Sequence, residues 1–305
     1  PPLAINPIST DRSLDDAQTE TVARIGTSQV PHSYYDGCID DIAFHIAGTQ
    51  ASTAASLYLK ANAFATENFA NYDDLVRSMM PDSSWRCDDL TTGLGYEDMG
   101  YNRATWYNQP VVQQPGIPNG GSCFLLDGTQ YGQSGHKSAY SINKTGTLSI
   151  SVWASSSDLS VDMGLMAKGG NTASGAGAEW EIRQNDDGTL TARVVDTGLH
   201  NNKTIYTTDN PLTLNALTHI VVVFHGYTQN KLIEIYFNGV LQPATLGTTS
   251  NVYNYGEVLT APLYFGRSFN YLGQTWKGKF TKANTFGRVL SQSDVTALYN
   301  MGAST

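Results

Sequence analysis

The chain has 305 residues, a net charge of −9, and 15% charged residues, where soluble domains usually have about a quarter. Nucleic-acid binding is disfavoured, because phosphate contacts need clustered lysine and arginine and the sequence has no such cluster. The longest purely apolar run, Ile220 to Phe224, has the length of a strand and is far short of a membrane span. The many serine, threonine, asparagine and glycine residues favour an extracellular or particle-surface β protein.

The beginning of the chain repeats its end. Residues 37–58 align without a gap with residues 278–299, and four identities carry the match: Gly37/Gly278, Ser52/Ser293, Leu57/Leu298 and Tyr58/Tyr299. A spacing of about 240 residues is too long for a solenoid repeat and suits the closing segments of two successive domains. We therefore predict that residues 1–62 are the C-terminal part of a domain whose beginning precedes Pro1, and that residues 63–305 form a complete second domain.

Between these two segments the sequence predicts a helical stretch and then a loop. Residues 54–59 and 73–80 have helical character and would link the fragment to the main domain. Residues 106–122, with three prolines and three glycines, are predicted to be loop. The three cysteines, Cys38, Cys87 and Cys123, leave at least one unpaired; either Cys87 pairs with Cys123 or all three are buried thiols.

Strand patterns dominate from about residue 120. Residues 148–152 alternate apolar and polar side chains, residues 190–195 do so more loosely, and residues 219–225 are a nearly continuous apolar run that suits a strand buried on both faces. Residues 232–237 end at Asn238-Gly239, a strong hairpin turn. Short strands separated by such turns indicate an antiparallel sandwich or barrel.

The chain closes with a short helix. Ser291 and Asp294 have the spacing of a capping box, in which each side chain satisfies a free amide of the first turn. Val295, Leu298 and Tyr299 then fall on one face, so this helix is expected to pack on a sheet.

From Asn71 onward the chain resembles the laminin-G-like, concanavalin-A-like jelly-roll family. The motifs that carry the resemblance occur in the family's order at residues 84–89 (SWRCDD), 97–102 (EDMGYN), 123–128 (CFLLDG), 146–154 (GTLSISVWA), 217–224 (LTHIVVVF), 235–240 (IYFNGV) and 264–267 (YFGR). The resemblance implies an all-β fold, an antiparallel two-sheet jelly-roll sandwich with one short C-terminal helix. It does not imply one function, since this sandwich hosts lectins, adhesion modules, glycosidases and virion proteins.

The resemblance also implies where calcium would bind. Family members hold Ca²⁺ between an acidic loop and an acidic pair in the closing segment, and Asp98 matches the loop. Thr281 and Lys282 stand where the family has its acidic pair, which removes anionic ligands and adds a cation. The N-terminal copy keeps Asp40 and Asp41, which are either ligands of a second site or a solvated turn.

Aromatic side chains in loops are the candidate glycan contacts. Sugar rings stack on aromatic faces while amides and carboxylates bond their hydroxyl groups. The candidate contacts are Trp106, Tyr107, Asn108, Tyr253, Tyr255, Tyr271 and Trp276. The alternative for each is packing in the sandwich, which is the expected role of Trp153 and Trp180.

Glu179 and Glu181 are the candidate catalytic pair. Side chains repeat every two residues in a strand, so Glu179-Trp180-Glu181 places two carboxylates on one face, as in glycosidases of this fold. The next position in register is Arg183 rather than a third acid, which disfavours catalysis.

The sequence therefore favours a non-enzymatic adhesion module, one of at least two in tandem, that binds glycans through loops at one rim or on the concave sheet. Its expected partners are surface glycans or neighbouring protein subunits, including further copies in a homo-oligomer. Its expected location is extracellular, at the cell surface or on a virus particle. Two alternatives remain open: a structural virion, fibre or filament subunit, and a divergent glycoside hydrolase using Glu179 and Glu181. No cofactor is required, and Ca²⁺ is the one ion the resemblance suggests.

Overall fold

The computed structural model describes residues 69–88, 94–95, 103–142, 147–169, 178–195, 203–226, 233–249, 261–269 and 275–304. The chain divides between Asn68 and Phe69, and all described residues belong to the second unit. The predicted domain fragment at residues 1–62 therefore lies outside the described residues, as does the predicted domain boundary.

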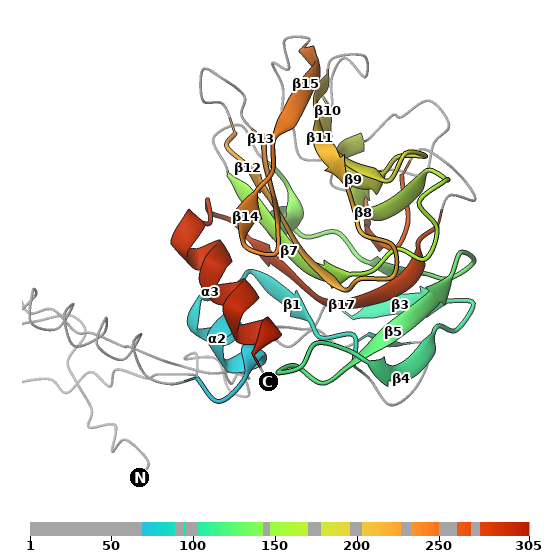
Figure 1. Ribbon diagram of the computed structural model, residues 1–305, viewed down its shortest axis with the longest axis vertical. Helices are drawn as coiled ribbons and strands as arrows, with labels where there is room; N and C mark the ends of the chain where they lie inside the picture. Colours follow the sequence, from blue (N-terminus) through green and yellow to red (C-terminus); the bar gives the residue numbers. More distant parts are fainter. Residues whose placement is uncertain are drawn as a thin grey trace, which may run out of the picture. The chain divides into compact units, whose positions relative to one another are not determined.

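The described residues form two antiparallel sheets and two helices (Figure 1). An eight-stranded sheet has the order β14-β13-β12-β7-β17-β5-β4, with β1 paired to β17. Its strands are β1 (Ser83–Trp85), β4 (Val111–Pro115), β5 (Ser122–Asp127), β7 (Leu148–Ala154), β12 (Thr218–Phe224), β13 (Ile233–Phe237), β14 (Val240–Leu241) and β17 (Lys277–Phe286).

A nine-stranded sheet has the order β15-β11-β10-β9-β8-β16-β6-β3-β2. Its strands are β2 (Leu94–Gly95), β3 (Ala104–Tyr107), β6 (Tyr131–Ser134), β8 (Met163–Gly169), β9 (Ala178–Gln184), β10 (Thr189–Val195), β11 (Lys203–Pro211), β15 (Ala244–Thr249) and β16 (Leu263–Phe265). The helices are α2 (Tyr72–Ser78), α3 (Gln292–Ala303) and a 3₁₀ turn at Ser138–Tyr140.

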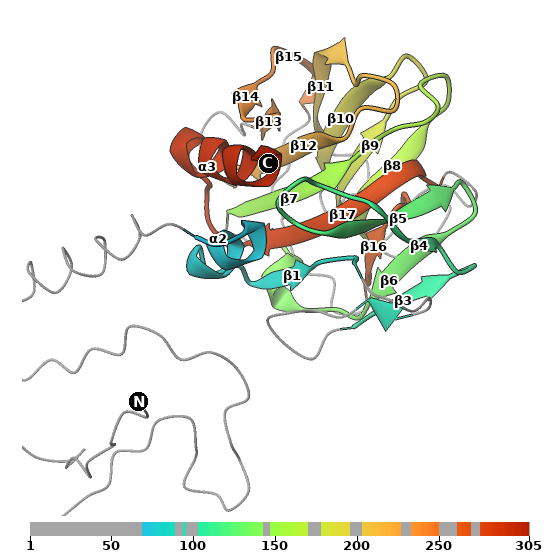
Figure 2. The ribbon, with the colours of Figure 1, turned by 60° about the horizontal axis from the view of Figure 1, so that its bottom comes forward.

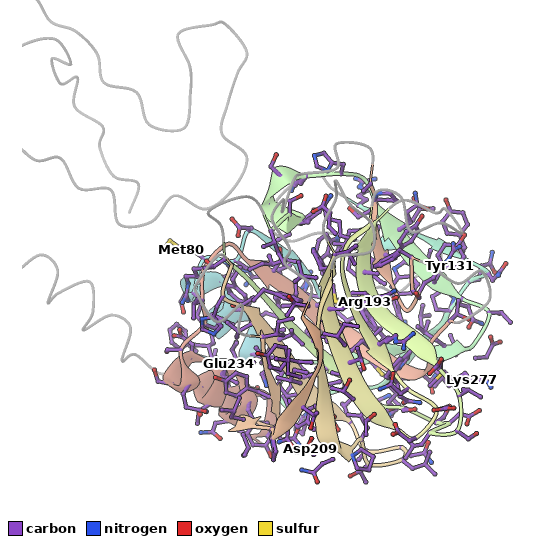
Figure 3. All side chains as sticks on the ribbon, turned by 90° about the horizontal axis from the view of Figure 1, so that it is seen from above. Met80, Tyr131, Arg193, Asp209, Glu234 and Lys277 are labelled. Carbon is purple, nitrogen blue, oxygen red and sulfur yellow. The ribbon has the colours of Figure 1, made fainter. Side chains whose placement is uncertain are left out.

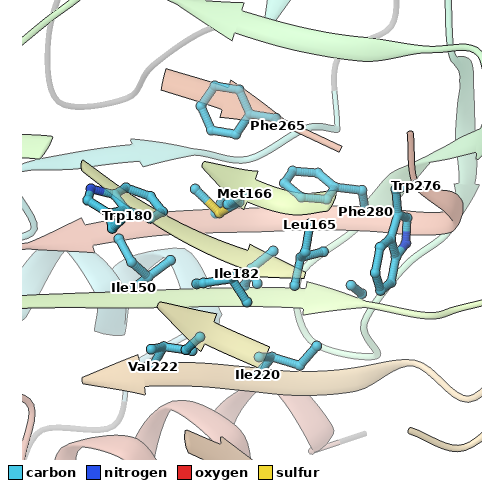
Figure 4. Packing of buried hydrophobic residues seen from close by; sticks show 14 of the residues in the cluster. Ile150, Leu165, Met166, Trp180, Ile182, Ile220, Val222, Phe265, Trp276 and Phe280 are labelled. Carbon is cyan, nitrogen blue, oxygen red and sulfur yellow. The ribbon is translucent and has the colours of Figure 1, made fainter. Parts of the chain in front are cut away.

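The two sheets enclose the hydrophobic core, as Figure 4 shows. Inward-facing side chains of β7 and β12 meet those of β8, β9 and β16; among them are Ile150, Ile220, Val222, Leu165, Met166, Trp180, Ile182 and Phe265. The indole N–H of Trp180 donates a hydrogen bond to the carbonyl of Tyr140 at 2.7 Å, so its polar edge is satisfied inside the core. This arrangement confirms the predicted all-β jelly-roll sandwich.

The strongest sequence patterns correspond to a strand, a hairpin turn and a helix of the predicted types. The continuous apolar run is β12, and all seven of its residues are buried, because the core covers one face and the helices the other. At the hairpin turn that ends β13, Asn238 and Gly239 have φ of 50° and 80°, the left-handed conformations that this turn requires. At α3, Ser291 and Asp294 form the predicted capping box.

The predicted loop at residues 106–122 is wrong in part. Val111–Pro115 is β4, which pairs with β5 along one side. Two prolines flank or end this strand, and prolines are tolerated there because β4 is an edge strand whose outer amides need no partner in the sheet. Proline content therefore indicated an edge rather than the absence of a strand.

The backbone at Gly278 of the closing motif requires glycine. Its φ is 133°, and a Cβ there would lie 1.9 Å from the carbonyl oxygen of Ser155. Glycine allows β17 to approach the segment after β7, where the amide of Ser155 bonds the carbonyl of Lys279 at 3.0 Å.

Candidate functional site

Only one sheet has an outer face covered by the described helices. Helices α2 and α3 pack on the eight-stranded sheet, and Figures 1 and 2 show both on that side of the sandwich. The contact is apolar and includes Tyr72, Val76, Val295 and Leu298 of the helices with Trp153, Val221, Val223 and Phe286 of the sheet. Among the described residues no helix packs on the nine-stranded sheet, so its outer face is the candidate binding surface.

One row of side chains crosses this outer face from strand to strand. Tyr264 of β16 stands opposite Ala167 of β8, Ala167 opposite Glu181 of β9, and Glu181 opposite Arg193 of β10. The neighbouring positions along these strands, such as Ile182, point into the core, so strand alternation directs the row outward. Figure 3 shows Arg193, together with Tyr131 of β6, among the side chains of the molecule seen from above.

Three tyrosines and one arginine form a stacked group, which we call the tyrosine shelf: Tyr107, Tyr131, Tyr264 and Arg267. The rings of Tyr107 and Tyr131 are stacked at 4.6 Å with an interplanar angle of 16°, because these residues are direct cross-strand partners. The guanidinium carbon of Arg267 lies 4.6 Å from the ring centre of Tyr131 and 5.1 Å from that of Tyr264. These contacts hold the rings in place.

The shelf is graded from buried to exposed. Tyr264 is 3% exposed, and its burial raises the pKa of its phenol, which therefore stays neutral. Tyr131 is half-buried, and Tyr107 at the edge of the shelf is 40% exposed. The result is one aromatic ring presented to solvent on a fixed support.

Asn108 fixes the corner beside Tyr107. Its φ is 59°, and its side-chain amide donates a hydrogen bond to the carbonyl of Thr129 at 2.8 Å. Asparagine tolerates this left-handed conformation better than most residues. Asn108 thus ties the end of β3 to the turn that precedes β6, the two strands that carry Tyr107 and Tyr131.

Glu181 is bound to internal partners. Its Oε2 lies 2.6 Å from Nε of Arg193, and its Oε1 accepts a hydrogen bond from the hydroxyl of Ser268. The Arg193 guanidinium also lies over the ring of Phe269 at 4.8 Å. The Glu181 side chain has no exposed surface, so its charge is used to hold the segment after β16 against the sheet.

Glu179 is bound in the same way. Its Oε1 accepts a hydrogen bond from the ammonium of Lys168 at 2.8 Å, and that ammonium also contacts Nδ1 of His136 at 3.1 Å. Lys168 is fully buried and Glu179 is 3% exposed. In a retaining glycosidase, one carboxyl donates a proton and the other attacks the sugar. Both glutamates here are enclosed and paired with cations, so neither is placed to reach a substrate.

Two of the predicted glycan contacts lie in the core instead. Trp106 is 4% exposed and its ring centre is 5.1 Å from that of Phe124; Trp276 is fully buried and donates a hydrogen bond to the carbonyl of Ser155 at 2.9 Å. Strand alternation explains Trp106, because Ala104 and Trp106 of β3 point inward while Tyr107 points outward. The remaining predicted site residues lie outside the described residues: Tyr253, Tyr255, Tyr271, Asp98, Asp40 and Asp41.

The sequence reasoning missed Tyr131, Tyr264, Arg267 and Arg193. Tyr264 and Arg267 belong to a recognised family motif, but a motif does not tell which face of a sheet its residues occupy. Tyr131 begins a short strand directly after the Asp127-Gly128 turn, and alternation there gave a weak signal.

Lys282, one of the two positions where the family has its acidic pair, is a buried cation. Its ammonium lies 3.0 Å from Oδ2 of Asp73 and 3.2 Å from Oδ2 of Asp88, and the side chain is 1% exposed. The hydroxyl of Thr281 donates to the carbonyl of Arg86 at 2.7 Å. Within the described part of the chain, no group of three or more histidine, cysteine or acidic residues could hold a metal.

Cys87 and Cys123 are both buried thiols rather than partners in a disulfide. The thiol of Cys123 lies 3.3 Å from the carbonyl of Pro115, and burial raises its pKa to about 11. Cys123 is therefore protonated near neutral pH and has little reactivity.

Two packed antiparallel sheets, with the described helices on the outer face of only one of them, define a jelly-roll sandwich. The chain belongs to the concanavalin A-like lectin/glucanases superfamily: the laminin-G-like model of that superfamily matches residues 126–296, more than half of the chain. A search of the curated proteins found no match. Of the helices that the structure describes, none has the length and apolar character that crossing a bilayer requires.

Solved structures with a similar fold include binding domains of botulinum neurotoxins. The binding domain of serotype G has a TM-score of 0.51 at 15% identity over 73% of this chain and 51% of that one. The receptor-binding domains of the C/D mosaic serotype and of neurotoxin D each have a TM-score of 0.50 at 16% identity over 72% of this chain, and cover 51% and 52% of those chains. The chain thus spans about half the length of these domains, and at such identity the likeness shows the fold alone.

Proposed function

We propose that this protein is a non-enzymatic adhesion module that binds glycans through the tyrosine shelf on the outer face of the nine-stranded sheet. The observation that carries the proposal is the ring of Tyr107, 40% exposed and stacked on Tyr131, which Arg267 contacts in turn. A sugar ring presents an apolar face of C–H groups, and a fixed aromatic ring binds such a face without losing conformational freedom.

The state of the glutamates supports binding over catalysis. Glu179 and Glu181 are the acidic pair that a glycosidase of this fold would use, and each is buried in an internal ion pair. The similar solved structures are binding and receptor-binding domains of neurotoxins, which agrees with a binding role. The low charge and the many small polar residues favour a location outside cells or on a particle surface.

Truncation of the exposed ring tests the proposal. In Tyr107→Ala, we expect at least about a 10-fold loss of affinity for the glycans that the native chain selects on an array, because a ring contact contributes about 1.4 kcal/mol. Tyr107→Phe should retain most of the affinity, because it keeps the stacked ring. Leu241→Ala serves as the control, since Leu241 is an exposed apolar residue at the edge of the other sheet.

Two results would contradict the proposal. One is an array on which the native chain binds no glycan at high protein concentration. The other is equal affinity of Tyr107→Ala and the native chain, measured by calorimetry, for the glycans that do bind.

A further inference from the structure

A depression lies beside the tyrosine shelf at one end of the sandwich. Its volume is about 400 Å³, which lies within the range of small-molecule sites. It is lined by Gly128, Val161, Asp162, Met163, Asp186, Thr275 and Lys277. These residues come from the turns after β5 and β9, the segment before β8 and the start of β17.

The floor and walls are held by contacts among these segments. The amide of Lys277 donates to the sulfur of Met163 at 3.2 Å, and the hydroxyl of Thr275 donates to the carbonyl of Gly128. The turn after β5 is further fixed by Asp127, whose carboxylate accepts hydrogen bonds from the amide and hydroxyl of Thr129 at 2.9 and 2.8 Å. The hollow is therefore a fixed part of the fold.

The lining of the depression has a net negative charge. The one cation, Lys277, is neutralised by Asp158 at 3.0 Å, and hydrogen bonds from Ser160 together with Lys277 lower the pKa of Asp158 to about 2. Asp162 and Asp186 make no ion pair with a described residue. Two acidic residues, Asp162 and Asp186, thus line the hollow without an ion pair to a described residue, and carboxylates accept hydrogen bonds.

Two connections join the depression to the shelf. Thr275 of the lining pairs through its backbone with Arg267, the arginine that lies over Tyr131. Gly128 precedes Tyr131 by three residues, so their Cα atoms are at most about 10 Å apart, the length of a fully extended segment. Tyr131 and Lys277 also lie on the same side of the molecule in Figure 3. The lining and the shelf are thus connected through one backbone pair, and a ligand that occupies both must span the distance between them.

We propose that the depression is a second saccharide subsite, which seats a sugar unit without negative charge: a neutral sugar or an amino sugar. The inference rests on the proposed function of the shelf. The carboxylates of Asp162 and Asp186 accept hydrogen bonds from hydroxyl or ammonium groups, whereas they repel a uronate, sialate or sulfate group placed within a few ångströms. Binding at two joined sites makes the second contact intramolecular and strengthens the first.

An array that carries neutral, amino and anionic glycans tests the subsite. The native chain should bind neutral or amino glycans, and its affinity for their anionic counterparts should be at least about 5-fold lower. The double variant Asp162→Asn, Asp186→Asn should lose this discrimination while its melting temperature stays close to that of the native chain. Asp74→Asn, which removes an exposed carboxylate on α2, is the matched control and should leave the glycan profile unchanged.

The outcomes separate the two proposals. Equal binding of anionic and neutral counterparts by the native chain, or an unchanged profile in the double variant, overturns the subsite. The shelf stands in that case if Tyr107→Ala still lowers the affinity about 10-fold or more. An array without any hit overturns both. Raised salt adds an independent check, because screening should weaken the discrimination and leave ring stacking in place.

Discussion

Lys282 shows how much one buried charge contributes to this fold. Its ammonium is enclosed and stands between the carboxylates of Asp73 and Asp88, which are 18% and 23% exposed. Its backbone has φ of 53°, at the point where the pairing of β17 with β7 changes register. That bulge directs a residue of the closing strand toward α2.

Replacement of Lys282 tests this role. Lys282→Met keeps much of the side-chain volume but leaves two neighbouring carboxylates without their cation, so we expect the free energy of unfolding to fall by about 3 kcal/mol or more. Lys277→Met is the control: its pair with Asp158 is 40% and 26% exposed, and water screens such a pair, so its loss should change the free energy of unfolding far less. Urea unfolding measures both. Equal losses in the two variants would show that burial gives Lys282 no special role.

His219 should make stability depend on pH. Its ring is buried, lies 2.9 Å from the hydroxyl of Ser151 and stacks on Trp153 at 4.9 Å, and burial lowers its pKa to about 3. The unfolded chain takes up a proton at an ordinary histidine pKa of about 6.5, whereas the folded chain resists it until about pH 3. The contribution of His219 to the free energy of unfolding is therefore fully present above about pH 6.5 and is lost as the pH falls from 6.5 toward 3.

The size of the effect follows from linkage. Between pH 7 and pH 5 the native chain should lose about 2 kcal/mol more of its unfolding free energy than His219→Gln, at about 1.4 kcal/mol per pH unit below 6.5. Glutamine keeps a polar group near Ser151 but cannot titrate. Parallel pH profiles of the two proteins in urea unfolding would refute this assignment.

Strand alternation explains which residue roles could be predicted. It separates Trp106 from Tyr107, so one of two adjacent aromatic residues had to be buried. It cannot show that Tyr107, Tyr131 and Arg267 meet, because their contact depends on the order of strands within the sheet. The role of Lys282 was hidden for the same reason, since Asp73 lies on a helix far from it in the sequence.

At the scale of elements, one close crossing positions the shelf. A Cβ at Gly164 of β8 would lie 1.9 Å from the amide nitrogen of Ser268 and 2.2 Å from the carbonyl carbon of Arg267. The segment after β16 therefore runs directly over β8, which brings Arg267 onto Tyr131 and Ser268 onto Glu181.

An added methyl group should displace this segment. We expect Gly164→Ala to lower the unfolding free energy by about 1 to 3 kcal/mol, because backbone atoms cannot yield as a flexible side chain can. It should also weaken glycan binding, since the support of Tyr131 moves. Gly247→Ala is the control: on β15 the nearest atom to an added Cβ would be 3.9 Å away. Native stability and binding in Gly164→Ala would contradict the proposed crossing.

Elements whose start, end and buried face can be identified in their own sequence were predicted well. Elements that depend on hydrogen bonds from a neighbouring strand were not. The helix at Gln292–Ala303 has its cap and its apolar face in its own sequence. Strand β4 has neither, and it exists because β5 supplies its hydrogen bonds. The family motifs compensate at β5, β7 and β12, where they also give the order of strands along the chain.

At the scale of the whole described unit, the outer faces of the two sheets differ. The outer face of the eight-stranded sheet is closed by α2 and α3, while that of the nine-stranded sheet carries the shelf. Sequence patterns predicted the sandwich but not this division, because both sheets contain strands of similar composition. The division follows from where the two helices pack.

Helix α2 determines where a force applied to the chain at Phe69 enters the sandwich. It is the first element after Phe69, so a pull along the chain from that end reaches the sandwich through α2. The load would fall first on the Asp73–Lys282 pair, on the backbone bond from Tyr72 to Asn119 at 3.1 Å, and on the contact of Tyr72 with Trp153. We expect a force applied at Phe69 to break these contacts of α2 before it separates the strands of the sheets.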